Sequence, residues 1–123
     1  MNTENLLIKK TDFEKISHLV SQNNSDLAAL LDEELQRASI VEDGELPVDV
    51  ASMNSTISFV DLDAKKEQTV TLVYPHEASL EENKVSILAP IGAALIGLRV
   101  GQSIKWPLPN GKNRNLQVTA VNS

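Results

Sequence analysis

The chain has 123 residues, of which 41% are hydrophobic and only 3% aromatic, and it carries a formal net charge of −6. This is the length of one domain, or of one small domain with an appendage, and its core must be aliphatic. The lack of cysteine excludes disulfides and thiolate metal sites, and the scarcity of aromatic side chains argues against binding of single strands by base stacking.

The negative charge is confined to the N-terminal part. Residues 1–47 contain four Lys/Arg and ten Asp/Glu, whereas residues 48–123 contain seven of each. Binding to phosphates requires Lys and Arg, so this segment is not expected to bind duplex nucleic acid. An acidic segment suits a basic protein surface, and the alternative is a solvated helix face that keeps the protein soluble.

Two amphipathic helices are expected in this acidic part. Thr11 to Glu14 has the pattern of a capping box, which predicts a helix from about Asp12 to Gln22. Asn24 or Ser25 can cap a second helix, whose apolar stripe is formed by Leu27, Leu30, Leu31, Leu35 and Ala38. Because the link between them is short and polar, we expect a short antiparallel helical hairpin.

The pattern changes from helical to alternating after the polar segment 42–47. Strands are predicted over five segments: 56–62, 68–74, 84–88, 104–108 and 116–121. The fourth is expected at a sheet edge because of its prolines, and Asn110-Gly111 favours a tight hairpin turn to the fifth. The fold class is therefore α+β, with a small antiparallel sheet that is expected to fold without the helices.

One short helix is expected to cross this sheet. Pro90 is suited to the first position of a helix, and Gly97 is suited to ending it in the left-handed conformation. The intervening residues are apolar throughout.

The sequence contains no pattern of residues that indicates a catalytic site. His18 and His76 lie in different parts of the sequence without other ligands at metal-binding spacing, and no phosphate-binding glycine loop is present. We therefore expect no metal or cofactor and surface or packing roles for both histidines. The first residues do not have the pattern of a signal or a membrane span, so a cytoplasmic protein without membrane contact is expected, and monomer is the default state.

Four segments resemble, in the same order, the regulator of nucleoside diphosphate kinase family, a short-armed relative of the Gre transcript-cleavage factors. They are residues 52–55, 72–75, 85–98 and 100–107. The resemblance implies a short, coiled-coil-like helical arm over residues 1–46 and a domain with the FK506-binding-protein-like fold over residues 47–123.

The resemblance also implies docking to RNA polymerase near the mouth of its secondary channel. In the Gre relatives, the loop and helix start that match this run lie on the docking surface, which nominates Ala89, Pro90, Ile91, Gly92 and Ala93. The alternative is that the run only closes the core. The acidic face of the arm, formed by Asp26, Asp32, Glu33 and Glu34, is a second candidate partner surface.

The same comparison argues against two activities. Gre cleavage factors have a longer hairpin whose tip carries two acids for the catalytic magnesium, whereas the tip expected here, 22–26, has only Asp26. Peptidyl-prolyl isomerases of this fold line their pocket with aromatic residues, which are sparse here. The remaining hypotheses are a polymerase-binding transcription regulator that is not an enzyme, and a regulator that contacts nucleoside diphosphate kinase directly.

Overall fold

The computed structural model describes residues 6–107 and 113–122. Its five-stranded sheet has the order β5-β4-β3-β7-β6, and the strands are β3 (Thr56–Asp61), β4 (Lys66–Val73), β5 (Lys84–Ser86), β6 (Ser103–Pro107) and β7 (Asn113–Asn122). The described helices are α1 (Lys10–Ser21), α2 (Asp26–Arg37) and α3 (Pro90–Leu95), with single 3-10 turns η1 (Asp43–Glu45) and η2 (Pro75–Glu77). The α+β class and the crossing helix are confirmed.

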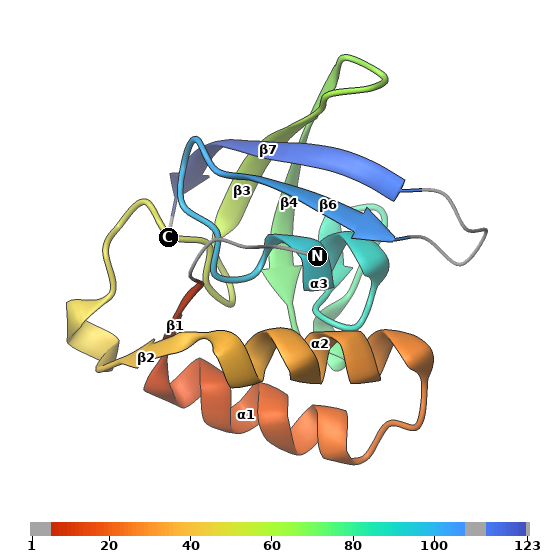
Figure 1. Cartoon of the computed structure of the whole chain (residues 1–123). Coiled ribbons are helices and arrows are strands. Elements are labelled where there is room, and N and C mark those ends of the chain that lie inside the picture. Colours follow the sequence, from red (N-terminus) through yellow and green to blue (C-terminus); the bar gives the residue numbers. More distant parts are fainter. Residues whose placement is uncertain (1–5, 108–112, 123) are drawn as a thin grey trace.

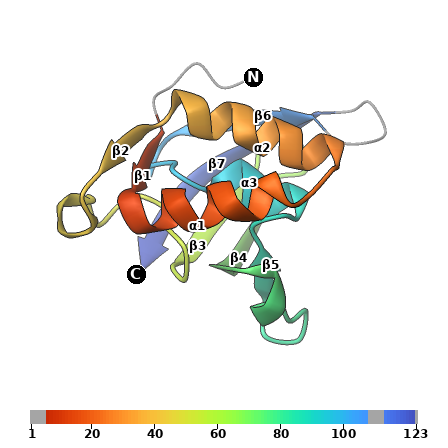
Figure 2. The same cartoon turned by 90° about the horizontal axis from the view of Figure 1, so that it is seen from below.

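The elements form layers, with α3 between the sheet and the α1–α2 pair (Figures 1 and 2). Among the strand side chains whose burial the structure describes, the buried ones are aliphatic apart from Phe59, which is fully buried. Helix α3 contributes Ala93, Ala94 and Leu95 to the same core, which α1 and α2 close from the other side.

Helices α1 and α2 lie side by side and run in opposite directions (Figures 1 and 2). Each has 12 residues, which corresponds to about 18 Å. Ser25 caps α2, because its Oγ accepts a hydrogen bond from the backbone N–H of Ala28 at 3.1 Å.

The expected capping box at the start of α1 is wrong. The helix begins two residues earlier, at Lys10, directly after the strand β1 (Leu7–Lys9), so that Thr11 lies inside its first turn. The missing acceptor comes from η1 instead: Asp43 accepts the backbone N–H of Thr11 at 3.1 Å and its hydroxyl as well. These hydrogen bonds lower the pKa of Asp43.

The sheet is mixed, not antiparallel as expected, because β5 pairs with β4 in parallel. The chain reverses twice after β4, first through η2 and then through a turn closed by Ser79 and Lys84, so that β5 returns in the direction of β4. A further parallel pair, β1 with β2 (Ser39–Val41), was not expected from the sequence.

Two local expectations are confirmed and one cannot be compared. Strand β6 lies at an edge of the sheet, and Gly97 follows α3 with a φ of +82°. The Asn110-Gly111 turn lies outside the described residues.

The α1–α2 pair packs against the sheet domain, so that many contacts connect the parts of the chain before and after the 42–47 segment. Ile16, Leu31 and Leu35 are buried in the same cluster as the sheet and α3. Strand β1 also passes directly over the end of α3, where the backbone N–H of Leu7 donates to the Gly97 carbonyl at 3.2 Å. A Cβ on Gly97 would lie 3.0 Å from that of Leu6, so glycine permits both the left-handed turn and this crossing. The division into residues 1–46 and 47–123 stays a prediction.

Candidate functional site

The start of α3 brings together the residues nominated for docking, but on two different faces. Ala89 is the N-cap, with extended backbone angles, and Ile91 follows in the first turn; both are half-buried. Gly92 and Ala93 are buried instead. The accessible part of the nominated run therefore includes Ala89 and Ile91, while Gly92 and Ala93 are corrected to core positions.

Gly92 is buried because α3 approaches β5 very closely. A Cβ at this position would lie only 2.1 Å from the Ser86 carbonyl oxygen and 3.1 Å from the Ile87 Cα. No real Cβ tolerates such contact with backbone, so the glycine sets the distance between α3 and the sheet. Its role is packing, and it is not available to a partner.

A shallow apolar depression of about 250 Å³ lies beside Ala89. Its lining comes from the turn after η2, from β5 and from the helix start: Ala78, Ser79, Leu80, Lys84, Val85, Ser86 and Ala89. The turn residues were not predicted from the sequence as part of a partner surface. The available signal was Leu80, an apolar residue inside an otherwise polar turn.

The acidic face expected on α2 is smaller than the sequence indicated. Asp26 and Glu33 are exposed and Asp32 is half-buried. Glu34 is only 3% exposed and forms an ion pair with Arg37 at 2.5 Å, so it does not belong to an accessible face. The physical reason is its position, since Glu34 follows Leu31 by three residues and lies on the buried stripe of the helix.

A second depression, of about 320 Å³, brings the two histidines together. Lys15, His18 and Leu19 of α1 line it from one side, and Tyr74, Pro75 and His76 from the other. The rings of Tyr74 and His76 are stacked, and the Lys15 ammonium lies 5.8 Å from the centre of the tyrosine ring. Both histidines are exposed, as expected, although they come from parts of the sequence that seemed separate.

Asp12 of α1 joins the two parts of the chain. Its carboxylate is only 4% exposed and accepts the backbone N–H of Met53 at 3.1 Å. Burial raises the pKa of Asp12, while the hydrogen bond from Met53 and the charge of Lys9 act in the opposite direction. Burial and the nearby Asp12 also raise the pKa of Tyr74 to about 12. The sequence analysis assigned Asp12 only to a helix start.

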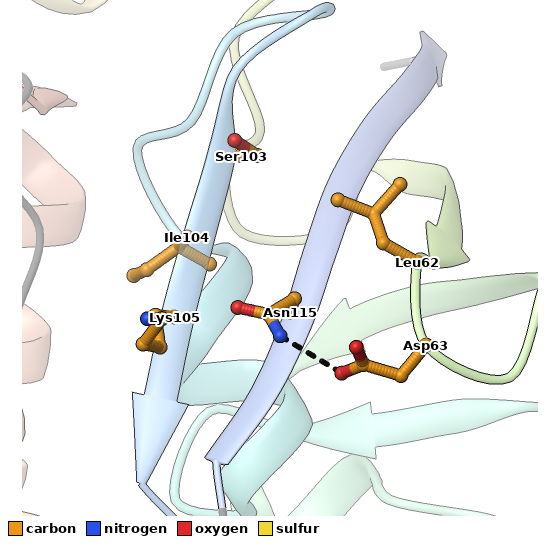
Figure 3. A pocket seen from close by; sticks show the side chains of 6 residues that line it. All are labelled: Leu62, Asp63, Ser103, Ile104, Lys105 and Asn115. Carbon is orange, nitrogen blue, oxygen red and sulfur yellow. Dashed lines mark hydrogen bonds between the residues drawn. The ribbon is translucent and has the colours of Figure 1, made fainter.

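A third depression, of about 350 Å³, lies beside the β6 edge of the sheet (Figure 3). Two of its polar side chains point toward each other, and Asn115 Nδ2 donates to Asp63 Oδ2 at 2.8 Å. This hydrogen bond explains the positions of both side chains, and the depression does not indicate a catalytic or binding role.

Within residues 6–107 and 113–122, no three His, Asp or Glu side chains gather as a metal site would require. No helix in this part of the chain is long and apolar enough to span a bilayer.

The fold and the α3 motif agree with a match to a known family. Residues 46–123 match the family model described as the C-terminal part of the transcription elongation factors GreA and GreB. The chain is also 39% identical over 121 residues to the "Regulator of nucleoside diphosphate kinase" of Escherichia coli strain K12, a comparison that spans 96% of this chain and 89% of that protein. The chain therefore belongs to the Gre superfamily and, within it, to the regulator of nucleoside diphosphate kinase family, as the resemblance indicated.

Two further relatives carry the name of the transcription factors. A solved structure, the "Prokaryotic transcription elongation factor GreA/GreB from Nitrosomonas europaea", superposes with a TM-score of 0.79 at 35% identity and covers 98% of this chain and all of that one. Transcription elongation factor GreA of Rhodospirillum rubrum is 35% identical over 91 residues, which are 74% of this chain and 57% of that protein.

Proposed function

We propose that this protein is a transcription regulator that docks on RNA polymerase near its secondary channel and does not stimulate transcript cleavage. The observation that carries the proposal is the match of residues 46–123 to the C-terminal part of GreA and GreB, because these relatives are named as transcription elongation factors. A role at the polymerase would place the protein in the cytoplasm.

The accessible surface at the start of α3 supports a docking role for this domain. Ala89 and Ile91 are half-buried, and the apolar depression beside Ala89 widens the surface toward β5. Apolar surface at the centre of a contact patch is the usual source of binding energy between proteins. We place the docking surface on Ala89 and Ile91 and on the backbone turn at Pro90.

The absence of cleavage stimulation follows from the α1–α2 pair. Each helix spans about 18 Å, and the tip over residues 22–26 has a single acid, Asp26 at the start of α2, where metal-assisted hydrolysis in the Gre cleavage factors uses two. A protein that occupies the channel entrance in this way would compete with longer-armed factors for the same opening.

Substitution of Ala89 tests the docking surface. Ala89→Arg places a long charged side chain over the depression and should lower affinity for core RNA polymerase about tenfold or more, as expected at the centre of an interface. Ala89→Ser is the control, because serine is small and a good N-cap and should leave both affinity and folding intact. Biolayer interferometry measures the affinity, and thermal unfolding shows whether each variant is folded. Equal affinity of both variants and the parent would refute this docking surface.

The second candidate function is direct contact with nucleoside diphosphate kinase. The observation in its favour is the similarity of almost the whole chain to the Escherichia coli protein that is named as a regulator of this kinase. Capture of partners from a lysate separates the two functions, because polymerase subunits and a small kinase differ in mass. Recovery of the kinase without polymerase would favour the second function.

A further inference from the structure

Leu80 is an apolar side chain that the structure presents to solvent. It is 94% exposed, the largest exposed fraction among the described large hydrophobic residues. Singly exposed hydrophobic residues are common on protein surfaces and need no explanation. Leu80 differs because it lines the depression together with Ala78, Val85 and Ala89, and so extends an apolar surface that reaches the start of α3.

Backbone hydrogen bonds fix the turn that carries Leu80. Ser79 and Lys84 exchange two of them, at 3.0 and 2.8 Å, and the N–H of Asn83 donates to the Leu80 carbonyl at 3.2 Å. Asn83 adopts a φ of +55°, a conformation that asparagine tolerates better than most residues. The position of Leu80 is therefore set by the turn, so a partner would not have to order it on binding.

The edge of this apolar surface is acidic. Between residues 75 and 91 the sequence has three glutamates, Glu77, Glu81 and Glu82, and one lysine, Lys84. All three glutamates are exposed, and Lys84 Nζ lies 3.6 Å from Glu82 Oε1. An apolar centre with acids at its edge is complementary to an apolar side chain flanked by Lys or Arg.

We infer that Leu80 and the adjoining depression form the apolar centre of the docking surface, and that they receive an apolar side chain of RNA polymerase with basic residues on either side. This inference rests on the proposed function and deepens it. It moves the centre of the contact from α3 itself to the turn over residues 79–84, with Ala89 at the shared boundary.

Two matched pairs of variants test the inference. Leu80→Asn removes the apolar side chain without changing charge, and Val48→Asn does the same at a position that is 81% exposed and lines none of the three depressions described above. Glu81→Lys and Glu67→Lys change net charge equally, at the acidic edge and on the exposed part of β4. Affinity for core RNA polymerase is measured by biolayer interferometry for each variant.

We expect Leu80→Asn to weaken binding about tenfold and Val48→Asn less than about twofold. We expect Glu81→Lys to weaken binding more than Glu67→Lys, with a difference that shrinks between about 50 and about 500 mM salt, since exposed charges are screened. Thermal unfolding should be the same for Leu80→Asn and the parent.

The outcomes separate this inference from the proposed function. If the parent protein does not bind polymerase, the proposed function fails. If the parent binds, but Leu80→Asn binds equally well or no worse than Val48→Asn, the inference is wrong and polymerase docking stands. Equal effects of Glu81→Lys and Glu67→Lys would likewise refute an acidic edge at this turn.

Discussion

Asp12 shows how one carboxylate links the two parts of the chain. It is buried between α1 and the sheet domain and accepts the N–H of Met53, 41 residues away. Burial raises its pKa above the ordinary value of 3.8. The ionised form is therefore disfavoured in the folded state. The contribution of protonated Asp12 to the free energy of unfolding is fully present below pH 3.8, and it is lost as the pH rises through the pKa of Asp12 in the folded protein.

Asp12→Asn should therefore stabilise the protein at neutral pH relative to the parent. Asparagine keeps an oxygen that can accept the Met53 N–H but has no charge to desolvate. The difference in thermal midpoint should decrease as the pH is lowered through the raised pKa of Asp12, because the parent then also carries a neutral side chain at this position. Unfolding scans over this range measure it, and a variant that is less stable by the same amount at every pH would contradict the account.

The close packing at Gly92 leads to a second prediction, which concerns the stability of a single-residue variant. Gly92→Ala places a methyl group 2.1 Å from the Ser86 carbonyl oxygen and 3.1 Å from the Ile87 Cα, which are backbone atoms that cannot move aside as a side chain could. We expect a loss of stability on the order of 3 kcal/mol from overpacking. Gly44→Ala is the control, because nothing lies within 4 Å of its added Cβ. Urea unfolding compares the two, and a Gly92→Ala variant as stable as Gly44→Ala would refute the close approach of α3 to β5.

At the scale of elements, the acidic face of α2 is expected to oppose a basic surface of the polymerase. The variant Asp26→Asn/Asp32→Asn/Glu33→Gln removes three charges and leaves the buried Glu34–Arg37 pair intact. Displacement of a labelled Gre-type factor from polymerase should become about threefold weaker at low salt and change little at high salt. If the variant and the parent displaced the factor equally well at both salt concentrations, this face would only solvate the helix.

The short α1–α2 pair predicts that the protein does not stimulate RNA cleavage in a backtracked elongation complex. The tip over residues 22–26 offers one carboxylate, Asp26 at the start of α2, where two would be needed to help hold a catalytic metal ion. Cleavage is followed on a labelled transcript with and without the protein. A rate above that of polymerase alone, abolished by Asp26→Asn, would contradict this.

Local patterns predicted most elements but not how they pack. The stripe of α2, the edge position of β6 and the glycine after α3 are determined by residues close in sequence, and the structure agrees. The parallel pairing of β5 and the Asp43 cap of α1 depend on contacts between parts of the chain that local patterns do not connect. The same holds for the docking run, in which spacing alone could not tell that Gly92 faces β5.

At the scale of the whole molecule, the helices and the sheet share one core. The α1–α2 pair covers α3 (Figure 2), and Ile16, Leu31 and Leu35 are buried in the core that the helices share with the sheet. The accessible start of α3, the turn over residues 79–84 and the acidic face of α2 are thus presented by one packed body. A change in the packing of α3 would move all three surfaces relative to one another.

The most direct test of the central claim is competition for core RNA polymerase between the intact protein and a labelled Gre-type factor. The account predicts that increasing concentrations of the protein displace the factor, and that Ala89→Arg displaces it about tenfold less well than Ala89→Ser. No displacement by the parent, together with no direct binding to polymerase, would contradict docking at the secondary channel.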